Sequence, residues 1–193
     1  MKVVIAFSGK KLSGKSTACE FCSRYFSSMG YTTTILNFAD AVKALVLDYF
    51  IPAQYKLLRE DLNKDEVKNM KIGKYTVRQM LQMVGTDMMR SIDENCWINV
   101  FNKELIRTPA DIIFCGDLRF KNELDYFQSL PFKSSTIRLT RVVTTDNHAS
   151  ETDLDDSMDK FDYVVDNADL EIADKNKQLR VICESIAKCL ISR

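Results

Sequence analysis

The sequence lacks the features that mark several large classes of protein. Lysine plus arginine and aspartate plus glutamate number 27 each, so the formal net charge is zero. Without a field of one sign, the chain does not resemble a protein that coats duplex nucleic acid. No apolar run approaches the roughly 20 residues that a membrane-spanning helix needs. We therefore expect no nucleic-acid and no membrane partner, with positive charge gathered only where an anion is handled.

Histidine and paired cysteines are too few for a metal cluster or a catalytic triad. Cys19 and Cys22 form a C-x-x-C pair, but no second pair completes a zinc site. Other cysteines stand in apolar or helical segments, which indicates free thiols in a reducing, cytoplasmic setting. His148 is the single histidine, and its stretch "NHASE" offers no triad partner. We interpret it as a loop residue.

Short β-branched runs alternate with longer helical patterns, which is typical of an α/β fold with a mostly parallel sheet. The opening run "MKVVIAFS" is too short for a signal peptide and predicts a first strand. Only three prolines interrupt the chain, and its length suits a single domain spanning 1–193. Strands are predicted at 2–8, 32–38, 111–116, 135–141 and 163–167. Helices are predicted near 15–29, 40–50, 75–90, 96–107, 119–129 and 174–191.

The stretch "GKKLSGKST" directly follows the first strand and fits G-x-x-x-x-G-K-[ST], the phosphate-binding loop. Gly9 and Gly14 permit backbone angles that side chains would forbid, so successive N–H groups can turn inward around an anion. Lys15 can reach the β- and γ-phosphates of a nucleotide, and the Ser16 hydroxyl can ligate a magnesium ion that bridges them. The segment therefore predicts a nucleoside triphosphate site. Its further ATP-binding residues are predicted to be Lys10, Lys11, Ser13 and Thr17.

This loop has a simpler alternative. A glycine-containing turn can cap a helix with ordinary polar residues in the first turn. Lys10 and Lys11 would then be plain solvated lysines. The preceding strand and the following helical run, "STACEFCSRYFSSMG", favour the phosphate-binding interpretation.

Two stretches are longer than the connections of a compact α/β domain require. More than 70 residues separate the second strand from the third, far more than a simple crossover needs. We expect residues of about 40–107 to form a helical insertion that binds the phosphate acceptor. The polar stretch at about 142–160 separates the fourth and fifth strands, and we expect it to form a lid.

The segment "IIFCGDLRF" places Asp117 one residue after the predicted third strand. The carboxylate on the magnesium side of a phosphate-loop site usually lies there. Arg119 would face the same crevice, at the carboxyl ends of the strands where α/β sheets bind ligands. The alternative is that Asp117 caps the following helix.

Polar residues recur along the predicted helix "RQMLQMVGTDMMR". Arg78, Gln82 and Arg90 stand four and eight residues apart, close to one face of a helix that continues through Gly85. Two arginines and an amide could clamp a phosphate monoester and hydrogen-bond a base. The alternative is a pair of solvated arginines that form ion pairs with Asp87 or Asp93.

Arg138 and Arg141 leave the predicted fourth strand toward the polar stretch. Arginines in this place could close over the transferring phosphoryl group and neutralise its developing charge. Each taken alone could equally be a surface arginine.

With these residues in view, the chain resembles the deoxynucleoside monophosphate kinases of bacteriophages. The elements "LQ-x-x-GTD-x-x-R" and "D-x-RF-x-NE" are more specific than the phosphate loop. The resemblance implies a three-layer phosphate-loop kinase fold with a parallel five-stranded sheet in the order 2-3-1-4-5. It also implies transfer of the γ-phosphoryl of ATP to a deoxynucleoside monophosphate (dNMP) with Mg²⁺, and a host-cytoplasm location if phage-encoded. The matching segments, in family order, are "FSGKKLSGKST", "NFADAVK", "RQMLQMVGTDMMR", "WI", "GDLRFKNELDYF", "SETDLD" and "FDYVVDNAD".

The same resemblance implies roles for individual residues. Asn167, after the last strand, would lie by the adenine, and Ser16 and Asp117 would serve the metal. Many members of the family carry an acidic residue where this chain has Ser16, so the metal coordination can differ here. A homodimer is a further expectation. The residues implied to bind dNMP are Asp40, Lys43, Arg78, Gln82, Arg90, Arg119 and Glu151. Those implied in the transfer itself are Lys15, Arg119, Arg138 and Arg141.

Three alternative functions are open to a phosphate-loop protein of this kind. Animal-type phosphomevalonate kinase shares the "FSGK…SGK" loop and an "SE-x-x-LD" tail, but the "LQ-x-x-GTD" segment favours a nucleotide acceptor. A GTPase would need N-K-x-D after a strand, and "NKDE" at 63–66 lacks the final aspartate. A non-catalytic nucleotide-binding module would have no need of the arginine clusters.

Overall fold

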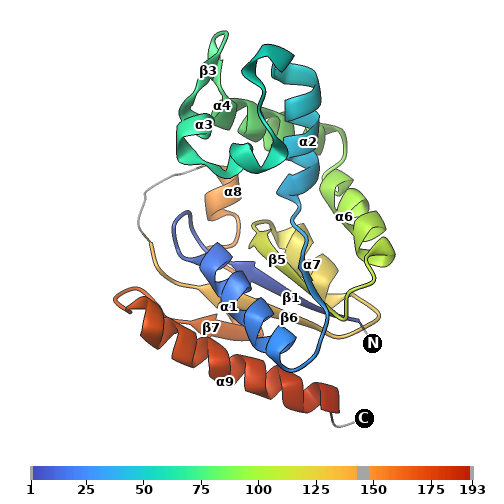
Figure 1. Cartoon of the computed structure of the whole chain (residues 1–193), viewed down its shortest axis with the longest axis vertical. Coiled ribbons are helices and arrows are strands. Elements are labelled where there is room, and N and C mark those ends of the chain that lie inside the picture. The colour runs from blue at the N-terminus through green and yellow to red at the C-terminus, as the bar shows by residue number, and fades with distance from the viewer. Residues whose placement is uncertain (1, 143–147, 192–193) are drawn as a thin grey trace. The chain divides into compact units, whose positions relative to one another are not determined.

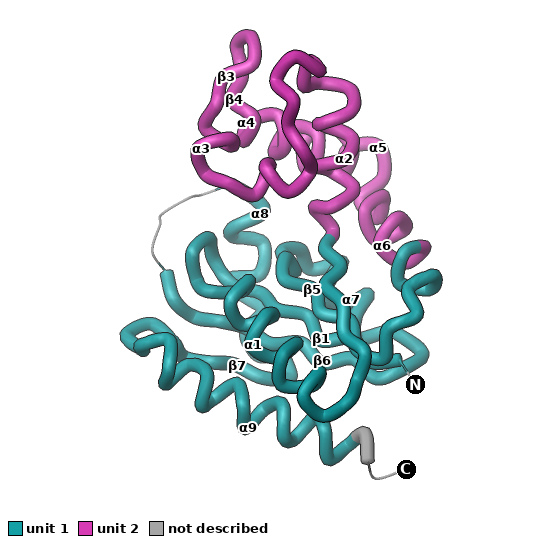
Figure 2. Tube along the Cα trace, viewed as in Figure 1, with its two compact units in different colours: residues 1–37, 104–193 teal, residues 38–103 magenta. Residues whose placement is uncertain are grey.

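The computed structural model describes residues 2–142 and 148–191 (Figure 1). The backbone divides into two compact units, which Figure 2 colours separately. Unit 1 comprises residues 1–37 and 104–193 and holds a five-stranded sheet, whereas unit 2 comprises residues 38–103 and is mainly helical.

The sheet of unit 1 is parallel throughout, with the strand order β2-β5-β1-β6-β7. Numbered by their place in the chain, these strands follow the order 2-3-1-4-5, so the predicted three-layer α/β fold is confirmed. The strands are β1 (Val3–Ser8), β2 (Thr33–Ile35), β5 (Ile112–Leu118), β6 (Ser134–Leu139) and β7 (Tyr163–Val165).

The central strand explains how the layers form. All six residues of β1 are buried, because a strand in the middle of a parallel sheet is covered by helices on both faces. Val3, Ile5 and Phe7 alternate onto one face, where they belong to a buried cluster with residues of the helices α1 (Lys15–Ser28) and α9 (Ile172–Ile191). In helix α7 (Lys121–Gln128), Leu124 and Phe127 are fully buried, and this helix packs against β6.

The helices of unit 1 follow the strands in the expected alternation. All six cysteines are free thiols, and the buried Cys22 of α1 hydrogen-bonds Cys183 of α9, which together with burial raises the pKa of the Cys22 thiol. Among residues 2–142 and 148–191, no helix combines the length and apolar character that crossing a bilayer would require. The helices are α1 (Lys15–Ser28), α7 (Lys121–Gln128), α8 (Ala149–Thr152), the 3₁₀ turn η4 (Met158–Lys160) and α9 (Ile172–Ile191).

Unit 2 is built from short helices and one small hairpin. Its core includes the fully buried Leu62 and Val77, and Phe38 stacks on Phe101 with ring centroids 4.5 Å apart. Its helices are α2 (Ala39–Phe50), η1 (Ala53–Tyr55), η2 (Arg59–Asn63), α3 (Asp65–Asn69), α4 (Val77–Gln82), the π-helix η3 (Met83–Met88), α5 (Met89–Ile92) and the start of α6 (Cys96–Arg107). Its strands are β3 (Lys71–Ile72) and β4 (Tyr75–Thr76).

The helix predicted near 75–90 is present over 77–92, but it is not an α-helix throughout. Thr76 caps its start, because its hydroxyl accepts from the Gln79 N–H at 3.2 Å while the Gln79 side chain accepts from the Thr76 N–H at 2.8 Å. The helix then widens into a π-helix around Gly85, whose missing side chain lets Val42 pack within 3.2 Å of where a Cβ would lie. The Trp97 indole donates to the Gly85 carbonyl at 2.7 Å.

Two strand boundaries also differ from the prediction. β5 continues to Leu118, which pairs with Ser8 after a register shift in β1, so Asp117 lies inside the strand and not after it. β2 ends at Ile35, and beyond this end the Asn37 side chain accepts a hydrogen bond from the Gly116 N–H of β5 at 2.8 Å. Of the predicted lid at 142–160, residues 143–147 lie outside the described residues.

Candidate active site

The loop between β1 and α1 has the backbone that its glycines predict. Gly9 has φ 150°, and a Cβ there would lie 2.5 Å from Ser13 Oγ and 2.8 Å from the Leu139 carbonyl oxygen. Gly14, at φ 92°, takes the left-handed conformation that begins α1. Any side chain at Gly9 would force the loop apart, so the sequence fixes a close turn in front of the helix N-terminus.

Lys15 is buried at the centre of this loop. Its ammonium donates to the carbonyls of Gly9 and Lys10 at 2.6 and 2.7 Å. Burial lowers the pKa of Lys15 to about 7, and the positive charge of Arg119 adds to this effect. The ammonium is therefore held where its charge is costly, which makes it responsive to any negative group that arrives.

Four charged side chains lie close enough to Lys15 to shift its pKa. Glu151 and Asp117 raise it, whereas Arg119 and Arg138 lower it. These residues come from β5, β6, α8 and the turn after β5, so the fold gathers residues from well-separated parts of the sequence around one ammonium. All four were predicted site residues.

Arg119 and Glu151 form an ion pair, and only 7% of the Glu151 side chain is exposed. Arg119 also donates to the Ser150 carbonyl at 3.0 Å, and Glu151 accepts from the Lys11 N–H at 2.7 Å. The carboxylate of Glu151 thereby joins the phosphate loop to the arginine that follows β5.

Arg138 is buried on β6 and reaches the same region. Its guanidinium donates to Ser8 Oγ at 2.8 Å and pairs with Asp155 at 3.2 Å, and Asp155 also pairs with Lys10. Burial lowers the pKa of Arg138, which the charge of Asp155 partly offsets. Its Nε is buried without a partner in the described part of the chain, so the guanidinium keeps one unused donor.

Asn167 and Arg141 shape the segment that follows β7. The buried amide of Asn167 donates to the Ser13 carbonyl at 2.9 Å and accepts from the Arg141 N–H at 3.0 Å. The Arg141 guanidinium donates to the carbonyls of Asn167, Ala168 and Leu170. Both side chains thus fix the segment after β7 against the phosphate loop, and a role of Arg141 in the transfer stays a prediction.

The two predicted metal ligands offer oxygen atoms. Ser16 is exposed in the first turn of α1, and Asp117 accepts from the Cys115 thiol at 3.3 Å. Burial raises the pKa of that thiol well above its usual value, and the charge of Asp117 contributes. No group of three or more metal-binding side chains occurs among the described residues. A hydroxyl and a carboxylate nevertheless fit Mg²⁺, which takes one or two protein ligands beside the oxygens of phosphates.

The predicted acceptor residues of unit 2 have local partners. Arg78 pairs with Asp65 at 2.8 Å, and Arg90 donates to the Glu94 carbonyl at 3.0 Å. Lys43 pairs with Asp40 at 3.2 Å, one turn earlier on α2, and Gln82 is half-buried at the end of α4. The π-helix lies between Gln82 and Arg90, so the wider turn alters the angle that an α-helix would set between them.

Residues 35–177, well over half of the chain, match the sequence model of the deoxynucleotide monophosphate kinase family. The chain belongs to this family. It is therefore a kinase-type phosphotransferase with a phosphate loop. The parallel sheet of unit 1 agrees with that assignment.

Two viral proteins are similar to this member of the family. One is named "Putative deoxynucleotide monophosphate kinase" in Acanthamoeba polyphaga mimivirus, with 26% identity over 97% of this chain and 96% of that protein. The other is the uncharacterized protein ORF77 of Ictalurid herpesvirus 1, strain Auburn, also 26% identical over 80% of this chain. The chain spans 60% of ORF77.

Solved structures with a similar course of the chain include two kinases. The adenosine 5′-phosphosulfate (APS) kinase CysC of Mycobacterium tuberculosis, as a Cys556Ala mutant, has a TM-score of 0.44 and 13% identity, over 95% of this chain and 98% of that one. Shikimate kinase from Aquifex aeolicus has a TM-score of 0.44 and 15% identity over the same shares.

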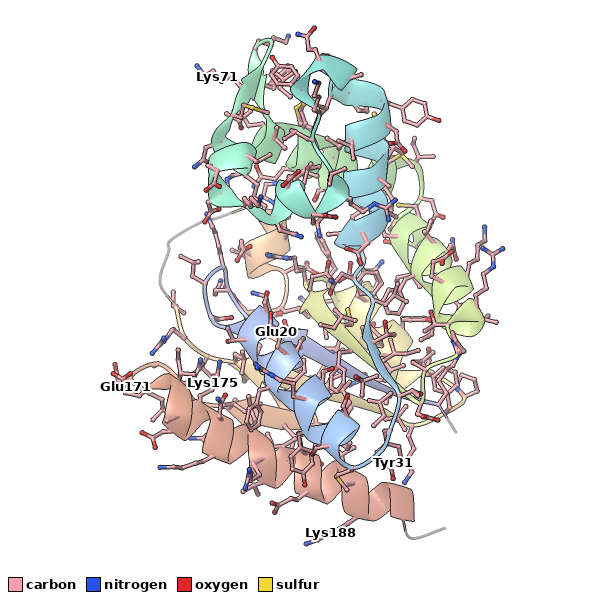
Figure 3. All side chains as sticks on the ribbon, viewed as in Figure 1. Glu20, Tyr31, Lys71, Glu171, Lys175 and Lys188 are labelled. Carbon is pink, nitrogen blue, oxygen red and sulfur yellow. The ribbon has the colours of Figure 1, made fainter. Side chains whose placement is uncertain are left out.

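Beside Asp155, three further residues of the site escaped the sequence analysis. Glu123 is buried on α7 and accepts from the N–H groups of Arg119 and Phe120 at 2.8 and 3.1 Å, which fixes the backbone of Arg119. Ser8 accepts from Arg138, as described above. Lys175 of α9 (labelled in Figure 3) is the third, and its ammonium donates to Thr17 Oγ1 at 2.7 Å. A signal for Lys175 was present, since it precedes Leu179 by one turn on an otherwise apolar helix face.

Proposed function

We propose that the protein transfers the γ-phosphoryl group of ATP to a dNMP, which yields ADP and a deoxynucleoside diphosphate. The observation that carries this proposal is the group of charged side chains around Lys15, which joins two arginines to a phosphate loop. A module that only binds nucleotides has no use for arginines placed beside the loop. The family assignment supports a nucleotide as the acceptor.

In the proposed reaction, the bond from the γ-phosphorus to the β–γ bridging oxygen breaks, and an oxygen of the dNMP phosphate bonds to the γ-phosphorus. Negative charge develops on the equatorial oxygens and on the leaving oxygen. Lys15, Arg119 and Arg138 would neutralise that charge. Because Lys15 and Arg138 are buried, their contacts count for more than they would in solution. The phosphates in turn keep Lys15 protonated, although burial alone lowers its pKa to about 7.

Ser16 and Asp117 would hold the magnesium ion, which when bound supplies charge neutralisation between the β- and γ-phosphates. Asp117 also acts on its surroundings through its charge, since it raises the pKa of both Lys15 and Cys115. Asp117→Asn should therefore weaken the response of activity to Mg²⁺. Asp125→Asn, on the exposed side of α7, is the matched control. An unchanged magnesium titration in Asp117→Asn would remove this residue from the site.

The acceptor is proposed to bind through Arg78, Gln82 and Arg90 of unit 2, with Asp40 and Lys43 nearby on α2. An arginine fork matches a phosphate monoester two hydrogen bonds at a time, and a half-buried amide can hydrogen-bond a base edge. In unit 1, Arg119 is proposed to contact phosphate, and Glu151 would orient Arg119. Residues 148–160 are proposed as part of the lid.

The test is a coupled assay of ADP release with the four common dNMPs, the matching ribonucleotides and phosphomevalonate. Turnover that depends on one or more dNMPs is expected. Turnover with phosphomevalonate alone would overturn the assignment of the acceptor. ATP binding without turnover on any of these would instead favour a non-catalytic module.

A further inference from the structure

The buried Lys175 stands out among the cations of unit 1. It lies at the N-terminal end of α9 (Figure 3), and only 4% of its surface is exposed. Its ammonium donates to Thr17 Oγ1 at 2.7 Å and lies 3.5 Å from the Gly14 carbonyl oxygen. A Cβ on Gly14 would come within 3.2 Å of the same nitrogen. The ammonium is therefore seated against the first turn of α1, beside the phosphate loop.

This position is electrostatically unfavourable for the protein alone. In the described part of the chain, Lys175 forms no ion pair with a carboxylate, and its two acceptors are neutral. Burial lowers its pKa, and the positive charge of Arg141 lowers it further. The N-terminus of α1 adds the positive end of a helix dipole. An anion bound at this place would offset all three of these costs.

Packing of α9 does not explain why a lysine stands here. Leu179, Ile182 and Ile186 continue the same face into the buried cluster of unit 1, where they are covered by apolar neighbours. An apolar residue at position 175 would extend that face without the cost of a buried charge. A lysine at this position therefore indicates a ligand rather than a contribution to the core.

We propose that Lys175 binds the phosphate chain of ATP on its α-phosphate side. The inference rests on the proposed function, because it requires that ATP phosphates occupy the loop at 9–17. Lys15 is suited to the β- and γ-phosphates, and Thr17 stands two residues further into the helix. Helix α9 directly follows the segment after β7 that Asn167 joins to the loop. Lys175 would thus contact the phosphate chain as a second cation beside Lys15. Its helix follows β7, whereas Arg119 follows β5, and these two strands lie on opposite sides of β1 in the sheet.

The experiment measures binding of ATP and of ADP by isothermal titration for the wild type, Lys175→Met and Lys175→Arg. Because both nucleotides carry the α-phosphate, Lys175→Met should weaken both by the same factor, about tenfold or more for a lost charge-assisted contact. Lys175→Arg should recover at least half of that loss on a logarithmic scale. Lys177→Met is the matched control, since Lys177 is exposed on the same helix and, among the described residues, pairs only with Asp174. This variant should bind both nucleotides as the wild type does.

Thermal unfolding of the free protein distinguishes a role of Lys175 in binding a ligand from a purely structural role. If Lys175 serves the phosphate chain, Lys175→Met removes a buried charge and should keep or raise the melting temperature while affinity falls. A lower melting temperature with a loss of affinity that arginine does not recover would overturn the proposal, as would unchanged binding of ATP and ADP. If Lys175→Met does not fold, that result counts as evidence for a purely structural role of Lys175, and the titration is repeated with Lys175→Gln. A wild type that binds no ATP would instead overturn the proposed function itself.

Discussion

The cations of the two units differ in where their partners come from. In unit 1, Arg119 pairs with a glutamate 32 residues away, and Arg138 donates to a serine 130 residues away. In unit 2, Arg90 donates to a carbonyl only four residues away, and Lys43 pairs within one helical turn. The first set is held by contacts between distant parts of the unit, whereas Arg90 and Lys43 have local partners and Arg78 pairs with Asp65, 13 residues away.

The difference teaches how each set can be used. Long-range partners hold the unit 1 cations in one geometry, which suits groups that stabilise developing charge without rearranging. Cations with local partners can exchange one acceptor for another at little cost, which suits recognition of an incoming substrate. If this comparison is right, substitutions in unit 1 should affect chemistry and stability, and those in unit 2 should affect mainly the acceptor.

The largest effect is expected from Lys15→Met. Loss of a contact that stabilises the transferring phosphoryl group costs several kcal/mol, which corresponds to a fall in turnover of about 10³-fold. The measurement is the coupled ADP-release assay at saturating substrates, with circular dichroism as the check on folding. Near-normal turnover in a folded variant would remove Lys15 from the transfer site.

Glu151→Gln tests whether the unit 1 ion pair is a structural element. The substitution leaves Arg119 without its anion and weakens the bond from the Lys11 N–H, and we expect a loss of about 3 kcal/mol in the free energy of unfolding. Urea denaturation provides the measurement. A loss as small as that of a surface pair would show that unit 1 is no more preorganised than unit 2.

The pH dependence of stability should report the burial of Lys15. Its pKa is about 7 in the folded protein, and an exposed lysine titrates near 10.4. Between these pH values the unfolded chain binds a proton that the folded protein does not, so this lysine makes the free energy of unfolding rise with pH. Lys15→Met lacks the effect, and its stability advantage over the wild type should shrink by about 2 kcal/mol from pH 7 to pH 9. Urea titrations of both proteins at three pH values would decide it; parallel slopes would contradict the buried ammonium.

Arg90→Lys tests the acceptor side of the comparison. A lysine keeps the charge but cannot form the two parallel hydrogen bonds of an arginine fork, so KM for dNMP should rise about tenfold. The affinity for ATP, measured separately by titration, should stay unchanged. A loss confined to ATP affinity would overturn the assignment of Arg90 to the acceptor.

The smallest effect is expected from Asp65→Asn, which removes the partner of Arg78. Because this pair is partly exposed, its loss should lower the free energy of unfolding by less than about 1 kcal/mol. The same urea denaturation that measures Glu151→Gln gives the value. A loss equal to that of Glu151→Gln would erase the distinction between the units.

Much of the fold could be predicted because its signals are local and repeated. The buried strands are recognisable as apolar runs in the sequence. In "GKKLSGKST", the positions of Gly9 and Gly14 predict the turn of the backbone. The strand order followed from the resemblance to a known family. The extension of β5 through Asp117 escaped prediction, because pairing with Ser8 of β1 is a long-range contact.

The site was predicted unevenly for the same reason. Arg119, Arg138 and Glu151 were found by motif and position, and the structure brings all three near Lys15. Their partners could not be read from the sequence, since Asp155 and Ser8 are ordinary residue types made specific by the fold. Lys175 is the clearest example of what the sequence could not predict. A role for one lysine on an apolar helix face becomes visible only through its contact with Thr17, 158 residues earlier in the chain.

The π-helix at Met83–Met88 sets the angle about the helix axis between Gln82, which precedes it, and Arg90, which follows it. Each residue of an α-helix turns the chain by about 100°, so gaining or losing one residue rotates everything beyond it by that angle. A π-turn absorbs one extra residue without breaking the helix. If the segment closed as a plain α-helix with all of its residues kept, Arg90 would swing by about a quarter turn relative to Gln82. Deleting one residue within 83–88 would also allow a plain α-helix, but it would leave Arg90 close to its present direction. The directions in which the amide and the guanidinium point thus depend on the π-turn as well as on residue type.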